Sequence, residues 1–304
     1  MAVWLDDVVS QERQLLPGQA ACAGCGPAIN IAHVLGALAA AAPKSKTVLV
    51  IPASCWTIIT GVWPVNAFRV AVHLTPFASA AAEAAGIKAA LRLQGRDDTN
   101  VVVWGGDGAT FDIGFAGVSA AAERNEDLIY VLNDNEAYMN TGNQKSGATP
   151  EGAWTTTTPV GAPRAGQKKD IDRIMAAHGI PYVATLAAGS VPMLRDFRAK
   201  VARAAELRGF RFLHTLGACP PGWKYPTANT TEIARLAVES RYFPLVACEE
   251  GQWRITFRPK HELPVSEFLK TQGRFSHLSA EEIDTIQAHV EARWELLAGM
   301  EAPG

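Results

Sequence analysis

Two polar turns, each at the end of an apolar strand, constrain the fold of this chain more than any other feature. The run Val101 to Trp104 leads into Gly-Gly-Asp-Gly at 105–108, and the run Asp127 to Leu132 leads into Asn-Asp-Asn-Glu at 133–136. The segment Phe111 to Glu123 between them has the pattern of a helix. Parallel strands joined by one helix are usually neighbours, so both turns should lie at the same edge of one sheet, where such sheets bind ligands.

The two turns carry oxygen atoms of the kind that Mg²⁺ prefers. An octahedral Mg²⁺ takes few protein oxygens and fills its shell with phosphate and water. Asp107, Asn135 and the backbone carbonyl of Ala137 supply a carboxylate, an amide oxygen and a carbonyl. Either turn alone could be an ordinary connection between a strand and a helix. At this spacing the pair predicts a site for a metal-bound diphosphate.

Strands and helices continue to alternate toward the carboxyl terminus, which predicts a doubly wound, mostly parallel α/β sheet. Glu249 to Gln252 reads as a hairpin turn into an antiparallel strand. We expect one domain over residues 1–304, with a core at about 16–250 and a small C-terminal extension at about 251–304. The expected helices are Asp170–His178, Val191–Leu207, Asn229–Arg241 and Ala280–Leu297, and the expected strands are Tyr182–Thr185, Arg211–Thr215, Leu245–Cys248 and Trp253–Phe257.

Composition excludes some classes of partner. The chain has a formal net charge of −2 and no basic stripe, so nothing attracts it to nucleic acid or to anionic lipid. No apolar stretch reaches the roughly twenty residues that span a bilayer, and Ile29 to Ala42 is expected to be a packed helix. Asp6, Asp7 and Glu12 stand where a signal peptide would have basic residues. We therefore expect a cytoplasmic protein without a membrane span.

Five cysteines offer a second possible site. An odd number of thiols without a signal peptide favours a reducing compartment. Cys22 and Cys25 form a CxxC pair, which alone could be half of a zinc site, a redox pair or two core residues. Cys55 follows the apolar strand Thr47 to Ile51, and Cys219 follows the expected strand that ends at Thr215. Thiols at strand exits fall on the same side of the sheet as the two polar turns, so four of them can meet, and four thiolates suit Zn²⁺ or a [4Fe–4S] cluster.

The GDG turn followed by the Asn-containing turn resembles the thiamin diphosphate motif. The longer segment from Asn133 to Gly161 looks like the β subunit of the pyruvate:ferredoxin oxidoreductase family, and the similarity extends from Leu16 to about His277. The Asn-Thr-Gly tripeptide at 140–142 is similar to the pyruvate branch of that family rather than to the 2-oxoglutarate branch. The resemblance implies the thiamin diphosphate-binding fold.

The resemblance also implies roles for individual residues. Asp107, Asn135 and the Ala137 carbonyl would be the Mg²⁺ ligands. Asn140 would act at the reacting carbon as the catalytic residue. The family holds a proximal [4Fe–4S] cluster with cysteines in matching contexts, while Cys248 is left over as a core thiol. The remaining implied residues are Gly106, Gly108, Thr141, Cys55 and Trp56 for cofactor binding and Cys22, Cys25, Cys55 and Cys219 for the cluster.

The implied activity is oxidative decarboxylation of a 2-oxo acid, with pyruvate as the default, to acyl-CoA and CO₂. Electrons would pass through the cluster to ferredoxin or another acceptor, and coenzyme A would be a co-substrate. Alternatives are an arylglyoxylate such as phenylglyoxylate, a branched-chain 2-oxo acid or oxalate as substrate. A non-redox thiamin decarboxylase or synthase with Zn²⁺ at the cysteines is a further alternative, and a non-catalytic scaffold is a third.

Several subunits are implied. In this family the glutamate that activates the aminopyrimidine comes from another subunit or domain, so an α subunit is expected, with γ and ferredoxin-like δ subunits beside it. Glu83 and Glu136 are weak local substitutes for that glutamate. The long segment Gly142 to Lys169 lacks helix or strand patterns, and loops of this length in a compact domain are usually functional or mobile. Its Trp154 to Gly161 part could be surface coil, but it matches the family and is expected to pack against the partner subunit and the cofactor. Lys168 and Lys169 could attract the phosphates of coenzyme A. Of the seven histidines, His33, His73, His178 and His214 lie in mixed or apolar surroundings and are expected to be structural.

Overall fold

A computed structural model describes residues 13–301 except 44, 62, 63, 163 and 165. Its centre is an eight-stranded sheet with the order β2-β1-β3-β4-β6-β5-β7-β8. The first six strands in that order run parallel, and β7 and β8 are antiparallel additions. The predicted doubly wound, mostly parallel sheet is confirmed. The strands are β1 (Thr47–Pro52), β2 (Ala71–Thr75), β3 (Asn100–Gly106), β4 (Leu128–Asp134), β5 (Tyr182–Leu186), β6 (Phe210–Leu216), β7 (Leu245–Glu249) and β8 (Gln252–Phe257).

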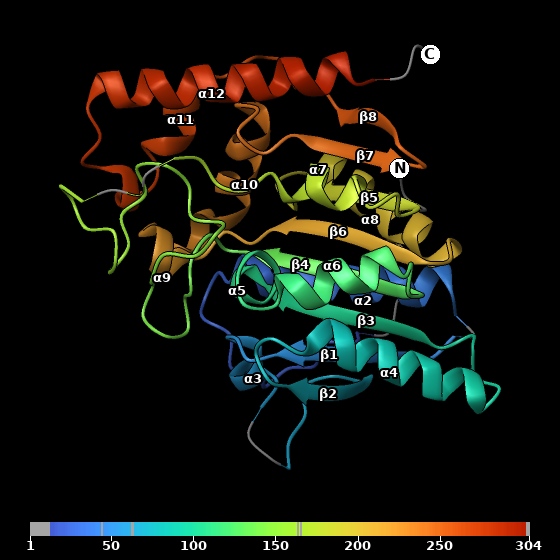
Figure 1. Cartoon of the computed structure of the whole chain (residues 1–304). Helices are drawn as coiled ribbons and strands as arrows, with labels where there is room; N and C mark the ends of the chain where they lie inside the picture. Colours follow the sequence, from blue (N-terminus) through green and yellow to red (C-terminus); the bar gives the residue numbers. More distant parts are fainter. Residues whose placement is uncertain (1–12, 44, 62–63, 163, 165, 302–304) are drawn as a thin grey trace.

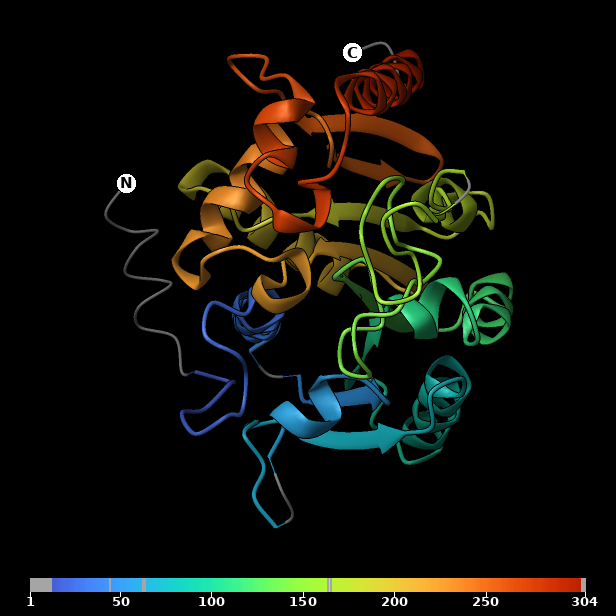
Figure 2. The same cartoon turned by 90° about the vertical axis from the view of Figure 1, so that its left-hand side faces the viewer.

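Helices cover both faces of the sheet, as Figures 1 and 2 show. The central strands β4, β5 and β6 are buried along their whole lengths, which explains their nearly continuous apolar sequences. On one face α4 and α6 pack with α7, and on the other α2 packs beside α8. These helices are α2 (Gly26–Ala41), α4 (Ala80–Leu93), α5 (Asp107–Phe111), α6 (Phe115–Glu123), α7 (Ile171–Ala176) and α8 (Val191–Glu206).

The helix predicted at Phe111 to Glu123 is two helices in the structure. Helix α5 begins at Asp107, and α6 begins only at Phe115. Asp112 breaks the helix because its carboxylate accepts hydrogen bonds from the Tyr138 hydroxyl at 2.6 Å and from the Gly147 amide at 2.8 Å. Those partners belong to a segment distant in sequence, so local periodicity could not reveal the break.

The C-terminal extension adds a hairpin and helices to the end of the sheet. Glu250 and Gly251 both have positive φ angles, of 50° and 81°, which is the geometry of a type I′ turn and agrees with the predicted hairpin. A third apolar cluster lies among the helices of this region. The helices of the extension are α11 (Val265–Leu269) and α12 (Ala280–Gly299), with a short 3₁₀ turn at Gly273–Phe275 between them. The remaining helices lie outside the extension: α3 (Trp56–Ile59) follows β1, and α9 (Pro220–Trp223), a 3₁₀ turn at Thr227–Asn229 and α10 (Thr230–Glu239) lie between β6 and β7.

Three expectations about the whole chain have different outcomes. No helix in the described part of the chain is long and apolar enough to cross a bilayer. Asp6, Asp7 and Glu12, on which the absence of a signal peptide rests, lie outside the described residues. The assignment of residues 1–304 to one domain stays a prediction.

Candidate active site

A cavity of about 280 Å³ opens where β3 and β4 end. The two strands are paired so that Gly106 stands opposite Asn133, which places the two polar turns side by side at one sheet edge. That edge faces the viewer in Figure 2. All the residues that were expected to bind the cofactor line this cavity. They are Cys55, Trp56, Gly106, Asp107, Gly108, Asn135, Ala137, Asn140 and Thr141.

Three oxygen atoms converge where the Mg²⁺ ligands were expected. The side-chain oxygen of Asn135 faces Asp107 Oδ1 at 3.1 Å and the Ala137 carbonyl oxygen at 2.7 Å. Acceptors cannot hydrogen-bond one another, so this arrangement needs either a cation between the oxygens or an amide turned to present its NH₂ group. The donor set of carboxylate, amide and carbonyl fits Mg²⁺.

Burial raises the pKa of Asp107 well above its usual range, and the nearby Asp134 carboxylate adds to the rise. Ser146 opposes this effect because its hydroxyl donates to Asp107 Oδ2 at 2.7 Å. A cation bound nearby would likewise stabilise the charged form of a buried carboxylate that lies beside other carboxylates. Sequence reasoning missed Ser146, although it lies close behind the Asn-Thr-Gly tripeptide.

The two glycines of the first turn serve different purposes. A Cβ atom on Gly106 would meet no heavy atom within 4 Å, so this position opens onto the cavity. A Cβ atom on Gly108 would lie 2.3 Å from both the Phe77 and the Tyr138 ring, so only glycine fits there. Asn133 Oδ1 is buried in the same cavity wall without a hydrogen-bond partner. Open backbone and an unpaired polar atom are features of a surface shaped to hold a polar ligand.

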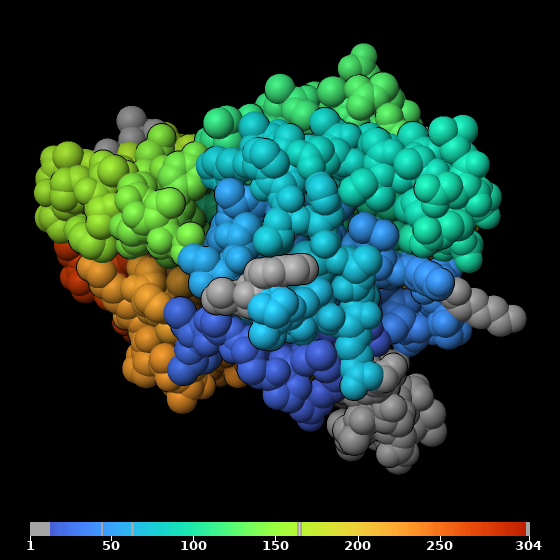
Figure 3. Space-filling view, turned by 90° about the horizontal axis from the view of Figure 1, so that it is seen from below, coloured from blue at the N-terminus to red at the C-terminus, as the bar shows by residue number. Residues whose placement is uncertain are grey.

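The four expected cluster cysteines come from three segments that approach one another. The Gly26 amide donates to the Ala218 carbonyl at 3.1 Å, which brings the residues beside them, Cys25 and Cys219, together. Figure 3 shows the dark blue segment before α2 against the orange segment around α9. Cys55 precedes α3 and lies at the cofactor cavity.

The pKa values of the thiols reflect the same convergence. Burial raises the pKa of Cys25 and of Cys55 to about 11, and the pKa of Cys219 to about 12. Charges on neighbouring cysteines add to each rise, including Cys22 in all three cases. The donor type suits a metal cluster, but no three His, Cys, Asp or Glu side chains of the described residues stand at metal-binding spacing. Cys248 is buried in β7, as expected for a core thiol.

A tryptophan supports the second polar turn from behind. Trp223 Nε1 donates to the Asn135 carbonyl at 2.9 Å, and the Arg274 guanidinium lies 3.8 Å from the centre of the Trp223 ring. Arg274 also forms an ion pair with Glu136 at 2.7 Å. Sequence reasoning used the Cys-Pro-Pro-Gly-Trp segment only for Cys219 and so missed that the same segment supports the second polar turn.

The structure contradicts the idea that Lys168 attracts coenzyme A. Its ammonium group is buried between Asp134 at 3.0 Å and Glu136 at 3.1 Å. Burial alone would lower the pKa of Lys168, but these two carboxylates raise it. Lys169 Nζ donates to the Phe111 carbonyl and lies over the Phe115 ring. Both lysines therefore make intramolecular contacts that link the segment before α7 to the rest of the fold.

The long segment between β4 and α7 packs against the two polar turns. It contains no helix or strand among its described residues. The Thr149 hydroxyl donates to the Glu136 carbonyl at 2.7 Å, beside the Ser146 contact described above. In the Trp154 to Gly161 part, Thr155 and Thr158 are buried, whereas residues 156, 157 and 159–161 are exposed, and its packing against a partner and the cofactor stays a prediction.

The two glutamates considered as local bases have other partners. Glu83 accepts hydrogen bonds from the Ser79 hydroxyl and from Thr75, and it lies 2.5 Å from His73 Nε2. Glu83 is not among the residues that line the cavity. Glu136 is fully buried and neutralised by the cations described above, so neither residue is arranged as a catalytic base.

His214 lies at the centre of a buried network. Its Nδ1 is 2.9 Å from Asp172 and its Nε2 is 3.0 Å from Asp134. Burial alone would lower the pKa of His214, but the two carboxylates raise it to about 9. His33 packs edge-on against Phe197, and His178 lies 3.2 Å from the Ser119 hydroxyl.

The family match and the most similar proteins found point to the same group of enzymes. Residues 60–215 match the family described as thiamine pyrophosphate enzyme, C-terminal TPP binding domain. The chain is 44% identical over 297 residues to ketoisovalerate oxidoreductase subunit VorB of Pyrococcus abyssi, covering 94% of this chain and 93% of the relative. It is also 44% identical to pyruvate synthase subunit PorB of Methanocaldococcus jannaschii, covering 94% and 97%.

A solved structure agrees in fold. A chain of the 2-oxoglutarate:ferredoxin oxidoreductase from Magnetococcus marinus superposes with a TM-score of 0.59 at 22% identity. The superposition covers 93% of this chain and 89% of that one. At this level of identity the likeness concerns the fold alone.

Proposed function

The chain belongs to the family of thiamin diphosphate-dependent 2-oxoacid oxidoreductase subunits, and from this premise we propose that it is the β subunit that carries the cofactor. The convergence of Asp107, Asn135 and Ala137 oxygens in a cavity at the sheet edge is the observation that carries the proposal. In this role the chain takes part in oxidative decarboxylation of a 2-oxo acid, with acyl-CoA and CO₂ as products. Ferredoxin or another acceptor receives the electrons.

The three oxygens would hold Mg²⁺, and through it the diphosphate at the open backbone of Gly106. Thiamin diphosphate, when bound, supplies a nucleophilic carbon and an electron sink for the decarboxylation. Trp56 and Tyr138 line the cavity and would exclude water from the reacting carbon. Asn140 is exposed at the cavity and would orient the substrate through its side-chain amide.

Cys22, Cys25, Cys55 and Cys219 would hold a [4Fe–4S] cluster next to the cofactor. Cys55 supports this arrangement because it lines the cofactor cavity, and the pKa of its thiol is raised by burial, by Cys22 and by Asp107. A cluster at this position would accept electrons one at a time. Tetrahedral Zn²⁺ is the alternative occupant.

Pyruvate is the default substrate. A branched-chain 2-oxo acid is the second candidate. The chain is 44% identical both to a ketoisovalerate oxidoreductase subunit and to a pyruvate synthase subunit, so sequence identity does not favour one of the two acids over the other. Assay of the co-purified complex with pyruvate, 3-methyl-2-oxobutanoate, phenylglyoxylate and oxalate separates the candidates. The acid with the highest kcat/KM identifies the substrate, and turnover without coenzyme A or an electron acceptor would favour the non-redox alternative.

The chain needs partners in this role. No glutamate among the described residues lines the cofactor cavity, so an α subunit would supply the base for the aminopyrimidine, with γ and ferredoxin-like δ subunits completing the complex. The odd number of cysteines supports a reducing compartment, the cytoplasm. Purification of the native complex and identification of its subunits test the predicted partners.

Asp107→Ala should abolish Mg²⁺-dependent binding of thiamin diphosphate. The substitution removes the only carboxylate of the three proposed ligands. Isothermal titration calorimetry of the full chain measures the affinity, with Asp107→Asn as a variant of the same shape and the exposed Asp98→Ala as the control. Unchanged affinity in the folded Asp107→Ala variant would reject the metal assignment.

Cys219→Ser should remove or destabilise the cluster while thiamin diphosphate binding is retained. Serine keeps the size of the side chain but is a poor iron ligand. Iron content and the electron paramagnetic resonance spectrum of the reduced protein measure the effect, and buried Cys248→Ser is the matched control. An unchanged spectrum in Cys219→Ser, or colourless wild-type protein with full thiamin content, would contradict the cluster assignment.

A further inference from the structure

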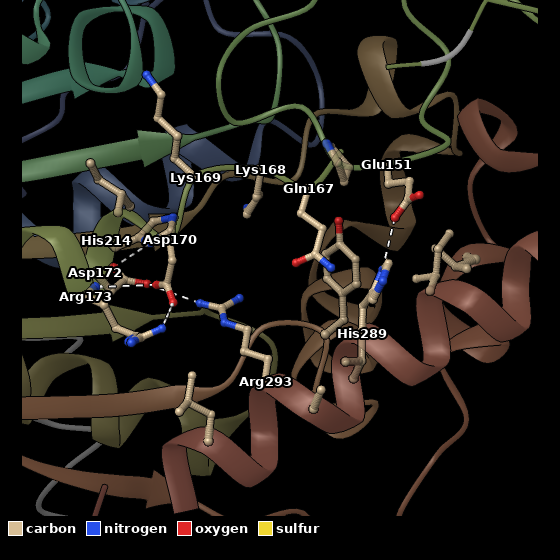
Figure 4. Close-up of a pocket in the computed structure, with 18 of the residues that line it drawn as sticks. Glu151, Gln167, Lys168, Lys169, Asp170, Asp172, Arg173, His214, His289 and Arg293 are labelled. Carbon is tan, nitrogen blue, oxygen red and sulfur yellow. Dashed lines mark hydrogen bonds and ion pairs between the residues drawn. The ribbon is translucent and has the colours of Figure 1, made fainter. Parts of the chain in front are cut away.

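A second cavity lies beside the buried network and is lined by Lys168, Asp172 and His214 among others. Its volume is about 390 Å³, within the range of about 300–1,000 Å³ that ligand pockets occupy. It opens between the segment that leads into α7 and the C-terminal helix α12 (Figure 4). None of the residues that line the cofactor cavity also lines this one.

The lining of this cavity is mixed. Leu269, Phe275, Ile286 and Val290 supply apolar surface, and charged and polar side chains supply the rest. Figure 4 shows Arg293 and His289 projecting from α12, with Gln167 directed between them. The cavity therefore suits a molecule with one polar end and one apolar end.

Arg293 has unused hydrogen-bonding capacity. Among the described residues its one ion pair is with Asp172, at a long 3.4 Å, and its side chain is 27% exposed. A guanidinium group has five N–H donors. Asp172 is already bonded to His214 at 2.9 Å, so it only partly neutralises Arg293.

The network of ion pairs that reaches this wall contains one more cation than carboxylates. The raised pKa of His214, about 9, keeps its imidazole protonated at neutral pH. Two carboxylates also stand at the cavity rim: Asp170 pairs with Arg173 at 3.5 Å, and Glu151 Oε2 lies 3.1 Å from His289 Nδ1. The network contains the cations Lys168, His214, Arg274 and Arg293 against the carboxylates Asp134, Glu136 and Asp172.

We propose that this cavity is a binding site for a small amphipathic carboxylate, such as a short aliphatic or aryl acid. The carboxylate pairs with the free donors of Arg293, and Gln167 donates a further hydrogen bond. The apolar body lies on Ile286, Val290 and their neighbours. The site stands apart from the cofactor cavity, so the proposal does not depend on the proposed function.

Hexanoate is the probe, and hexanamide is its uncharged counterpart of the same shape. Isothermal titration calorimetry uses the full chain saturated with Mg²⁺ and thiamin diphosphate, which fills the cofactor cavity. The wild-type chain is expected to bind hexanoate at one saturable site and to bind hexanamide at least about tenfold more weakly, because the charged hydrogen bonds are lost.

Two variants locate the site. Arg293→Gln should weaken hexanoate binding about tenfold or more, whereas the exposed Arg124→Gln leaves it unchanged. Leu296→Glu places a repelling charge at the cavity on a side chain that is 42% exposed, and it should weaken binding without unfolding the chain. Leu93→Glu, 90% exposed and remote from the cavity, is its control.

The proposal fails if the wild-type chain does not bind hexanoate, or if it binds hexanamide equally well. It also fails if Leu296→Glu and folded Arg293→Gln both keep wild-type affinity. Competition between hexanoate and thiamin diphosphate would assign the probe to the cofactor cavity and would overturn the proposal as well.

Discussion

At the scale of single residues, the site depends on side chains that orient a backbone turn. The second polar turn presents Asn135 and Ala137 to the cavity, and three groups hold it from behind. Trp223 donates to the Asn135 carbonyl, Thr149 donates to the Glu136 carbonyl, and Arg274 pairs with the Glu136 carboxylate. A turn held at its carbonyls keeps the oxygens of Asn135 and Ala137 fixed toward the cavity, which would lower the cost of ordering them if they bind the proposed Mg²⁺.

Trp223→Phe should destabilise the chain by about 1–3 kcal/mol more than Trp104→Phe. Both tryptophans are fully buried, so both substitutions remove the same ring volume. Only Trp223 loses a hydrogen bond, since Trp104 Nε1 has no partner. Denaturant unfolding measures the difference, and calorimetry should show weaker binding of thiamin diphosphate to Trp223→Phe. Equal free energies of unfolding for the two variants would show that the bond to Asn135 does not matter.

At the scale of elements, the main prediction error concerned the helix after the first turn. The apolar pattern from Phe111 to Glu123 predicted one helix, but Asp112 is withdrawn from it by Tyr138 and Gly147. Gly114 permits the sharp reversal, because a Cβ atom there would lie 2.1 Å from the Ala109 carbonyl oxygen. The C-terminal hairpin and helix were predicted well, since their signals are local. The turn has its two positive φ angles at Glu250 and Gly251.

Helix α12 begins with a complete capping box, and Ser279→Ala should therefore cost about 0.5–2 kcal/mol of stability. The Ser279 hydroxyl accepts from the Glu282 amide at 3.2 Å, and the Glu282 carboxylate accepts from the Ser279 amide at 2.8 Å. Thr285→Ala in the same helix is the control, because Thr285 is exposed and alanine favours helix there. Chemical denaturation compares the two variants, and a cost for Ser279→Ala no larger than that for Thr285→Ala would contradict the role of the cap.

At the scale of the whole molecule, one charged network joins distant parts of the chain. His214 on β6 contacts Asp134 at the end of β4 and Asp172 on α7, and Arg293 on α12 reaches the same Asp172. Lys168 connects Asp134 to Glu136 in the metal turn. Burial would raise the pKa of Asp134, but Lys168 and His214 lower it to about 2. The network therefore ties the C-terminal extension to the cofactor edge of the sheet.

The free energy of unfolding should fall as the pH rises from about 6.5 to 8. The folded-state pKa of His214, about 9, exceeds the ordinary value of 6.5. Its stabilisation is therefore complete below about pH 6.5 and is lost as the pH rises through 9, with a slope of at most about 1.4 kcal/mol per pH unit. Lys200 acts in the opposite sense above about pH 8, because burial lowers its pKa to about 8, so the window ends there.

Denaturant titrations at a series of pH values measure this slope in the wild type, in His214→Gln and in the exposed His261→Gln control. His214→Gln should be less stable at low pH and should lose its contribution to the slope, while His261→Gln should keep the wild-type slope. Identical slopes for all three proteins would show that His214 is not protonated in the folded chain at neutral pH.

Sequence reasoning predicted residues that line the cavity at the ends of β3 and β4, but it did not predict the residues that support them from behind. Asp107, Asn135 and Ala137 could be predicted because they follow strands in a recognisable motif. Ser146 and Trp223 could not, since nothing local in their sequence says which distant group each one contacts. The prediction that Lys168 attracts coenzyme A was wrong, because the local sequence does not show that Lys168 pairs with the buried carboxylates of Asp134 and Glu136.

The sequence by itself determined the sheet, the edge at which it binds ligands, and the oxygen and sulfur atoms available there. Those properties follow from apolar periodicity, turn residues and the donor chemistry of side chains, all of which are local. Only the tertiary structure decided which groups stand behind those atoms, how the buried charges are balanced, and that a second cavity lies beside Arg293. Such contacts join residues far apart in the chain, and their energies depend on burial and distance, which only the folded chain defines.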